Sequence, residues 1–345
     1  MLSPGLAKAC EFLVLEEISV MPLSVGGEVS RYKVDFVSRR NWFFLLSLII
    51  MIASLVSLIA PNGLKAGLEF TGGSSITLDF SDSPSQEALR SQLAELGHAD
   101  AVIQNAGAGS YFIRTRTLKE AVGSQPSERE SIITALETAF NTDIEIPDFF
   151  SVSPSIATET VRNAFFIVVI AALAILLYMT WAFRRVPSPF RYGVSAIVAL
   201  IHDVLVVMGI FSLCGRYFDL EVNAMFIIGV LTVIGYSVHD TIVVFDRIRE
   251  NVSNGVGRSL ESTINVSILE TLGRSFNTSL TLVFTLVALI LFGGPTIFNF
   301  LLVLLIGIVS GTYSSIAIAS QVLVVWERGE FPRFFPRRSK SATTD

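Results

Sequence analysis

Residues 231–251 read LTVIGYSVHDTIVVFDRIREN, an apolar segment of helical character that contains His239 and Asp240. An ionised carboxylate at the centre of a bilayer costs roughly 2.5 to 3.5 kcal/mol on insertion scales. Such a residue therefore normally faces a bundle interior or a wet cavity, where it serves the movement of protons or ions. The stretch predicts a membrane helix with coupled transport as its function, and Asp240 is the candidate carrier.

The composition indicates a membrane protein. Hydrophobic residues make up 51% of the chain and charged residues 16%, whereas soluble domains contain about 25% charged residues. The mean hydropathy of +0.61 agrees. No basic tract with interleaved aromatic residues suggests a nucleic-acid partner. We expect Cys10 and Cys214 on opposite sides of the membrane, which disfavours a disulfide or a cysteine metal site.

Six segments reach the roughly 20 mostly apolar residues that a spanning helix needs. They cover approximately residues 42–60, 163–183, 191–214, 224–246, 275–292 and 299–325. Lysine and arginine residues gather before the first span, after the last, and in the two loops on that same side. The opposite short loops contain Arg216 alone. The positive-inside rule therefore places both termini in the cytoplasm.

A polar stretch of about 100 residues between the first two spans is long enough for a small extracytoplasmic domain. Strand character at 68–80, 101–104, 111–115 and 142–152 alternates with two helices that begin after Ser83 and Ser127. The order β-α-β-β-α-β is that of a ferredoxin-like split βαβ domain. His98 follows the first of these helices, and we expect it to be a solvated surface residue.

These patterns together predict an α-helical membrane protein with one small α+β domain. The predicted parts are a cytoplasmic N-terminal segment (1–40), the first transmembrane helix (41–60), the extracytoplasmic domain (61–160), a bundle of transmembrane helices 2 to 6 (161–325) and a cytoplasmic tail (326–345). Between the fourth and fifth spans, residues 246–274 mix charges with apolar residues at helical spacing. That segment predicts an amphipathic helix along the cytoplasmic face.

Two His-Asp pairs lie in adjacent spans, His202-Asp203 in the third and His239-Asp240 in the fourth. Successive helical residues diverge by about 100°, so the two members of each pair cannot point the same way. For Asp203, an interhelical hydrogen bond that fixes packing and a functional role are both open. For Asp240 the functional interpretation is favoured, because small and polar residues, Ser237 among them, lie one turn away.

Arg274 opens the fifth span within a polar run that leads into lipid. One interpretation pairs it with deprotonated Asp240 and releases it on protonation. The alternative is an interfacial arginine that follows the positive-inside rule. In the sixth span, Gly307 and Gly311 with the small residues that follow predict a tight helix contact. No phosphate-binding loop, zinc-protease motif or serine nucleophile elbow is present, so we expect no enzyme activity, no cofactor and no metal.

Several stretches also resemble one known family. Residues 235–251 are similar to the signature of the SecF family, whose members are the smaller subunits of the bacterial SecD-SecF export complex in the RND superfamily. Further matches occur in the same order at GLEFTGG (67–73), ALIHD (199–203), LFGGP (291–295) and the glycine-rich sixth span. The resemblance extends from about residue 31 to residue 328.

The resemblance implies more than the spacing does. It assigns Asp240 and Arg274 to a proton-transport apparatus. From their position in the same spans, His239, Ser237, His202 and Asp203 are candidate supporting polar residues. It implies a multi-pass protein of the bacterial cytoplasmic membrane that works with a separate SecD chain. Driven by the proton-motive force, the pair would assist unfolded preproteins that leave the SecYEG channel after the ATPase SecA has acted, with YidC as a further partner.

Two positions depart from the family pattern. Glu69 stands where the family usually has Asp, and Ser153 stands where a glycine is expected before the second span. Both concern the connection between the domain and the bundle, since glycine tolerates backbone angles that serine does not. Two alternative functions stay open: a half-size RND exporter of lipids or small molecules, and a passive scaffold for translocon assembly.

Overall fold

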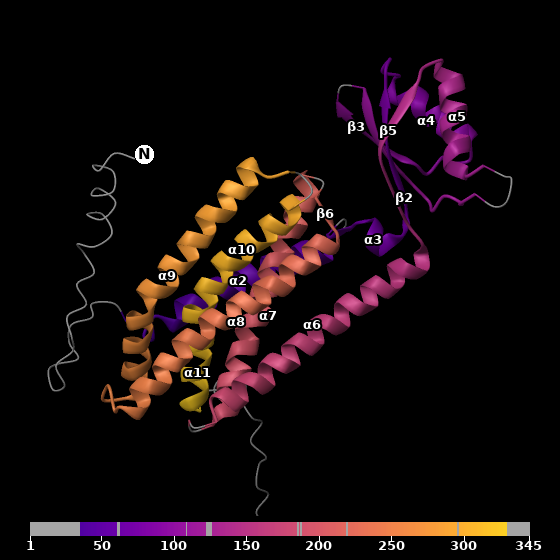
Figure 1. The fold of residues 1–345 in the computed structure, drawn as a ribbon. Coiled ribbons are helices and arrows are strands. Elements are labelled where there is room, and N and C mark those ends of the chain that lie inside the picture. The colour runs from indigo at the N-terminus through magenta and orange to yellow at the C-terminus, as the bar shows by residue number, and fades with distance from the viewer. Residues whose placement is uncertain are drawn as a thin grey trace, which may run out of the picture. The chain divides into compact units, whose positions relative to one another are not determined.

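The computed structural model describes residues 35–60, 63–107, 109–121, 126–184, 186, 188–218, 220–294 and 297–329. Most of the predicted N-terminal segment and cytoplasmic tail lies outside the described residues. Within the described part, six helical spans are long and apolar enough to cross a membrane, in agreement with the six predicted spans. They are α2 (Arg40–Ile59), α6 (Pro154–Ala182), α7 (Pro189–Phe218), α8 (Ala224–Ser253), α9 (Leu260–Phe292) and the continuous run of α10 (Phe298–Ser314), the π-helix η2 (Ser315–Ala319) and α11 (Ser320–Glu327) (Figure 1).

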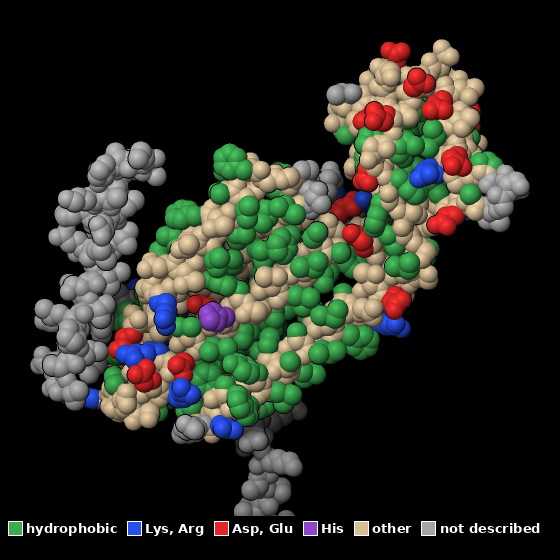
Figure 2. All heavy atoms as spheres, viewed as in Figure 1, with side chains coloured by type: hydrophobic (Ala, Val, Ile, Leu, Met, Phe, Trp, Pro, Cys, Tyr) green, Lys and Arg blue, Asp and Glu red, His purple; other side chains and the backbone are tan. Residues whose placement is uncertain are grey.

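Three of these spans form the centre of the bundle. Half or more of the most apolar window is buried in α7 (50%), α8 (50%) and the α10–α11 run (61%), whereas the values for α2, α6 and α9 are 17%, 6% and 17%. Hydrophobic side chains cover the viewed face of the helices in Figure 2, and charged side chains gather toward the helix ends. The three central helices therefore offer the most sheltered surroundings for polar groups within the apolar spans.

Glycines let these helices approach closely, as the sequence predicted for Gly307 and Gly311. A Cβ atom at Gly307 would lie 2.1 Å from the Val233 side chain of α8, and one at Gly311 would lie 3.2 Å from the Cβ of Ser237. On the other side of α7, a Cβ at Gly209 would lie 2.2 Å from the Ser54 side chain of α2. Glycine at these positions brings the backbones close enough for short side chains to hydrogen-bond between helices.

The amphipathic helix predicted at residues 246–274 is not a separate surface element. α8 continues to Ser253, and α9 begins at Leu260, where the Ser259 side chain accepts from the Ser262 N–H. Ile264 and Ile268 are buried in one apolar cluster with residues of α8. The prediction was wrong because the apolar face of this segment packs against the bundle, which extends α9 to 33 residues, about 50 Å at 1.5 Å per residue.

The α+β domain, from β2 to β5, has the predicted element order. Its helices and strands are β2 (Gly73–Phe80), α4 (Gln86–Glu95), β3 (Val102–Gly107), β4 (Ser110–Thr115), α5 (Glu128–Phe140) and β5 (Ile144–Val152). Within the described residues, the four strands form an antiparallel sheet in the order β3-β4-β2-β5. Alternate residues of β2 (Ile76, Leu78 and Phe80) are buried with Leu89 of α4 and Leu136 of α5, so both helices pack on one face of the sheet.

The departure from the family pattern at Ser153 has a structural explanation. Ser153 lies between β5 and α6 with φ −69° and ψ 147°, which is an ordinary extended conformation that needs no glycine. Its hydroxyl accepts from the Ile156 N–H at 3.4 Å and caps α6. α6 therefore begins at Pro154, nine residues before the predicted start of the second span, and the domain passes into the bundle through one residue.

The expectation that His98 is a solvated surface residue was wrong. The side chain is 1% exposed, and its Nδ1 lies 2.9 Å from the Thr115 hydroxyl. Its Nε2 lies 3.4 Å from Glu128 Oε1. Glu128, the first residue of α5, also accepts from the Lys119 N–H at 2.8 Å. That backbone hydrogen bond, together with the charge of Arg116, lowers the pKa of Glu128 below its ordinary value.

The Gly307 contact predicts a packing defect in a larger variant. Gly307→Ala should lower the free energy of unfolding of the detergent-purified chain by about 1 to 3 kcal/mol, the usual cost of overpacking, because its Cβ meets Val233. The midpoint temperature of unfolding should fall accordingly. Fluorescence-detected size-exclusion chromatography after heating measures this. Gly273→Ala is the matched control, since nothing lies within 4 Å of its Cβ position. Equal stability of the two variants would contradict the packing account.

The lowered pKa of Glu128 predicts acid sensitivity of α5. Stability that comes from this carboxylate is present above the pKa of the unfolded chain and is lost as the pH falls through the lower folded-state pKa. Hydrogen exchange in α5 should therefore accelerate in that acid range, after correction for intrinsic rates. Glu128→Gln should exchange faster at neutral pH and respond less to acid. Glu87→Gln, an exposed first-turn residue of α4, should behave like the unchanged chain.

Candidate functional site

Asp203 of α7 lies at the centre of a polar cluster inside the bundle and is 1% exposed. Its Oδ2 accepts from the hydroxyls of Ser237 on α8 and Ser314 on α10, each at 2.6 Å. Its Oδ1 accepts from the Ser310 hydroxyl of α10 at 2.7 Å and lies 3.1 Å from Nδ1 of His202. These short distances are typical of charge-assisted O–H···O⁻ bonds. The interhelical hydrogen bonds expected for Asp203 are therefore present.

Asp240 lies one turn after Ser237 on α8 and is 6% exposed. Its Oδ2 accepts from the Ser315 hydroxyl at 2.6 Å, and its Oδ1 has no hydrogen-bond partner among the described residues. The same Ser315 hydroxyl lies 3.1 Å from the carbonyl oxygen of Thr312. Asp240 thus keeps one carboxylate oxygen available for a proton, in contrast to Asp203.

Ser315 is also the first residue of the π-helix η2. Two buried side chains of α11 hold this turn through bonds to carbonyls five residues earlier: Ser320 to Ser315 at 2.9 Å and Gln321 to Ile316 at 3.2 Å. π-Helical turns are rare and occur often at functional sites. The turn places Ser314 and Ser315, which are consecutive, on the two different aspartates.

His202 of α7 is 2% exposed and lies beside α10. Its ring centroid lies 6.0 Å from that of Tyr313, whose hydroxyl donates to the Phe43 carbonyl at 3.1 Å and pairs with the Ser47 hydroxyl at 3.0 Å. The His202 Nε2 is enclosed and has no hydrogen-bond partner among the described residues. The ring therefore has one nitrogen toward Asp203 and a second, enclosed nitrogen without a hydrogen-bond partner among the described residues.

His239 and Arg274 lie on a different face from the aspartate cluster. Both side chains are exposed, and the described residues contain no ion pair between Arg274 and Asp240. Gly235 of α8 and Gly273 of α9 are exposed with nothing within 4 Å of their Cβ positions. The structure thus brings His202, Asp203 and Ser237 together, with Asp240 one turn along, and leaves His239 and Arg274 on an open polar face of α8 and α9.

The sequence interpretation missed the serines of the sixth span. It assigned Ser314 and Ser315 to a small-residue packing stripe, and the structure makes both of them donors to membrane aspartates. Ser310 was not singled out, although it donates to Asp203. The available signal was the spacing of Ser310 and Ser314, four residues apart and so on one helix face, opposite a span that contains an acidic residue.

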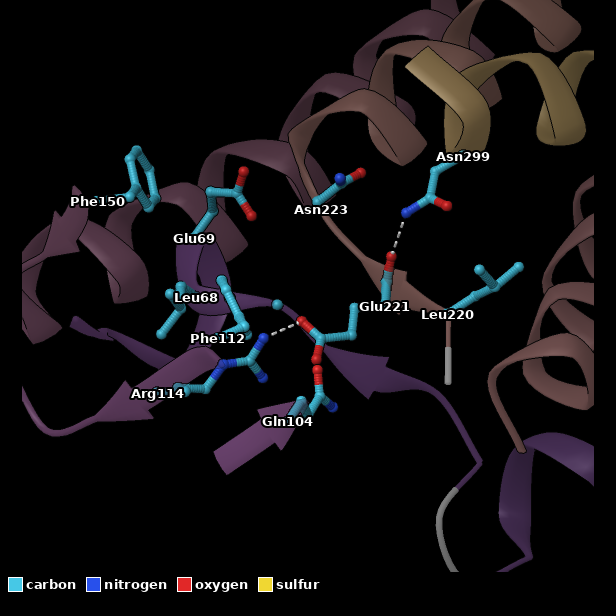
Figure 3. A pocket seen from close by; sticks show the side chains of 11 residues that line it. Leu68, Glu69, Gln104, Phe112, Arg114, Phe150, Leu220, Glu221, Asn223 and Asn299 are labelled. Atoms are coloured by element: carbon cyan, nitrogen blue, oxygen red, sulfur yellow. Dashed lines mark hydrogen bonds and ion pairs between the residues drawn. The ribbon is translucent and has the colours of Figure 1, made fainter. Parts of the chain in front are cut away.

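A separate cavity lies where the α+β domain meets the ends of the helices. It has a volume of about 330 Å³, and Figure 3 shows Arg114 of β4 pointing at the Glu221 carboxylate, with which it forms an ion pair. Asn299 of α10 donates to the Glu221 carbonyl at 3.0 Å. The lining residues are Gly67, Leu68, Glu69, Gln104, Phe112, Arg114, Phe150, Leu220, Glu221, Asn223 and Asn299.

A pair of hydrogen-bonded strands bounds this cavity. β1 (Lys65–Ala66) pairs in parallel with β6 (Glu221–Val222), and the Gly67 N–H donates to the Val222 carbonyl at 2.7 Å. Glu69, the second departure from the family pattern, lies in the short helix α3 (Leu68–Thr71) and faces the cavity. Within the described residues, no group of three or more His, Cys, Asp or Glu side chains is arranged to hold a metal ion.

Comparison with known proteins gives consistent matches. The family described as "Protein export membrane protein SecD/SecF, C-terminal" matches residues 132–329. The protein translocase subunit SecF of Thermobaculum terrenum is 45% identical over 316 residues, which are 90% of this chain and 99% of that protein. The protein translocase subunit SecDF of Bacillus subtilis is 32% identical over 87% of this chain and 39% of its own length.

The solved structures include the crystal structure of SecDF, a translocon-associated membrane protein, from Thermus thermophilus. It superposes with a TM-score of 0.70 at 31% identity over 89% of this chain and 40% of the SecDF chain. The chain thus spans about two fifths of these SecDF proteins and nearly the whole length of the SecF relative. A family match over more than half of the chain and 45% identity to a full-length relative show that this chain belongs to the SecF family of protein translocase subunits.

Proposed function

We propose that this SecF-family chain works with SecD to convert the proton-motive force into assistance for preprotein translocation across the bacterial cytoplasmic membrane. The observation that carries the proposal is Asp240, a buried carboxylate within an apolar span that keeps one oxygen free and is bonded through the other to the start of a π-helix. The proposal contains no enzymatic step, because the energy comes from proton movement.

Proton binding at Asp240 supplies the switch. The ionised carboxylate accepts from Ser315 at 2.6 Å, and protonation removes the charge that makes this bond strong. The Ser315 hydroxyl can then turn to the Thr312 carbonyl, which lies 3.1 Å away. Each proton that crosses the membrane field supplies about 2.3 kcal/mol per 100 mV. A few protons per cycle are enough to bias a two-state helix bundle.

SecD is the partner that fits the open polar face of α8 and α9. Arg274 and His239 lie exposed within apolar spans, and charged side chains at membrane depth normally face protein or a wet cavity. SecDF relatives carry this chain's counterpart within a longer protein. We therefore place SecD on this face, where its contact would bring Arg274 into the proton site with Asp240.

The distribution of lysine and arginine residues supports one orientation of the chain in the membrane. Arginine and lysine residues concentrate on the side of both termini, which supports cytoplasmic termini and an extracytoplasmic α+β domain at residues 61–160. The sheet order β3-β4-β2-β5 and the two helices on one face support a ferredoxin-like assignment for that domain. On that side of the membrane, the domain would meet unfolded preprotein as it leaves SecYEG, downstream of SecA, with YidC nearby.

Neutralising Asp240 tests the proton role. In vesicles that contain the chain with SecD and SecYEG, Asp240→Asn should reduce precursor release to the level seen without a proton gradient, because the side chain can no longer gain and lose a proton. Co-purification with SecD should be unchanged. Asp246→Asn is the matched control, since Asp246 is exposed on the same helix and pairs with Arg249 at 2.5 Å.

Full activity of Asp240→Asn would support the passive scaffold instead. Proton-coupled efflux of a lipid or small molecule by the purified chain without SecD would support the exporter. Both results would refute the proposed function.

The ion pair between Arg114 and Glu221 should transmit motion between the bundle and the α+β domain. Arg114→Glu should lower proton-driven release, because like charges then face each other across the cavity of Figure 3. The exchanged pair, Arg114→Glu with Glu221→Arg, should restore most of the release. Arg90→Glu, an exposed residue of α4, is the control. No recovery in the exchanged pair would show that charge complementarity at this junction is not needed.

A further inference from the structure

The two buried aspartates of the bundle have different hydrogen-bond environments. Asp203 accepts from three serine hydroxyls at 2.6 to 2.7 Å within the described part of the chain. An ionised carboxylate only accepts, whereas a protonated one must donate a hydrogen of its own. Hydroxyl donors can therefore serve both oxygens of an ionised Asp203, and one of them, Ser314, also lies 3.2 Å from the Gly311 carbonyl. Among the described residues, Asp240 has a single donor, Ser315, and no donor reaches its second oxygen.

We propose that Asp203 is a permanently ionised positioning residue that sets the proton affinity of Asp240, an inference that rests on the proposed function. Two carboxylates whose surroundings differ in this way take different roles, one as a fixed charge and one as the titrating group. Asp203 is thus distinct from the proton carrier, although the two occupy equivalent His-Asp pairs in the sequence.

The first effect of Asp203 is geometric. Its Oδ2 holds the Ser314 hydroxyl of α10 and the Ser237 hydroxyl of α8 at 2.6 Å. Ser314 is the residue before Ser315, and Ser237 lies one turn before Asp240. The fixed anion therefore anchors both partners of the bond between Ser315 and Asp240 from their neighbouring residues. This anchoring places the Ser315 hydroxyl at the start of η2, where it reaches Asp240.

The second effect is electrostatic. A negative charge close to a second carboxyl disfavours ionisation of that carboxyl, and the consecutive residues Ser314 and Ser315 connect Asp203 to Asp240. Under this proposal, the charge on Asp203 promotes proton uptake by Asp240. Among the described residues, the titratable groups of this region are His202 on α7, Asp240 and Tyr236 on α8, and Tyr313 on α10; Tyr236 bonds to Ser279 of α9 and to neither aspartate. α2 contributes Ser47, η2 contributes Ser315, and α9 contributes Ser279, which lies 2.8 Å from the Tyr236 hydroxyl.

His202 fits this assignment. With Asp203 ionised, the His202 Nδ1–H donates to Oδ1 at 3.1 Å, which leaves Nε2 as the enclosed nitrogen without a partner among the described residues. Asp203 keeps its three hydroxyl donors in this arrangement, and the group that the proposed function assigns to proton uptake is Asp240.

The pH profile of precursor release distinguishes positioning from structural support. In vesicles with SecD and SecYEG, the outer pH is varied and the pH of half-maximal proton-driven release is measured. Asp203→Asn should shift this pH downward by about one unit or more, because loss of the fixed charge weakens proton uptake. Asp203→Glu, which keeps the charge, should restore the original profile even if total release is lower.

Ser212→Ala is the matched control for packing cost. Ser212 is buried on the same helix and donates to the carbonyls of Ser57 and Gly63 at 3.1 and 2.9 Å. Its variant should change total release at most and leave the profile in place. An unshifted profile in Asp203→Asn, or equal shifts in the Asn and Glu variants, would overturn the assignment.

Infrared spectroscopy decides the question if Asp203→Asn does not assemble with SecD. In a chain that carries Asp240→Asn and Asp79→Asn, acidification should produce no exchange-protected carboxyl band. Asp79 is replaced because it also has an enclosed carboxylate oxygen. A remaining protected band would show that Asp203 takes up protons and would refute its fixed charge. Proton-driven release by the single variant Asp240→Asn would refute the proposed function itself. If Asp240→Asn does not support proton-driven release and the pH profile of Asp203→Asn is unshifted, only the role of Asp203 is refuted.

Discussion

An ionised carboxylate among membrane helices is stable only where protein groups replace the water that it has lost. Around Asp203 those groups are hydroxyls from α8 and α10 and the ring of the preceding histidine. The three central helices must therefore stand in one register, since a small rotation of any of them would leave the charge without donors. Gly307 and Gly311 serve the same requirement, because a side chain at either position would push α10 away from α8.

The need for donors at the buried aspartates also affects the backbone of the α10–α11 run. The α10–α11 run contains the π-helical turn η2 at the point where its serines reach the two aspartates. At the domain end of the bundle, a single residue separates β5 from α6. The β1–β6 pair joins the segment that leads into the domain to the connection between α7 and α8. The bundle that contains Asp240 is thus joined to the α+β domain by both covalent and hydrogen-bonded connections.

The structure also explains why the chain is suited to a complex. Its buried cluster is self-sufficient, with donors for Asp203 supplied by its own helices, whereas Arg274 and His239 lie on an open face. Polar side chains that face outward from an apolar span need a protein surface or water beside them. The longer SecDF relatives, of which this chain matches about two fifths, are consistent with a second half that covers this face.

The sequence by itself determined the six spans, the order of elements in the α+β domain and the family, and it singled out Asp240 as a candidate, because each depends on local composition, periodicity or a contiguous motif. Only the tertiary structure decided the hydrogen-bond partners of Asp203, two of which lie 107 and 111 residues away in the chain. It also decided that His98 is buried beside Glu128 and that residues 260–274 belong to the long helix α9. Such features arise where separate elements pack together, and no periodicity within one segment specifies which face of another segment it will meet.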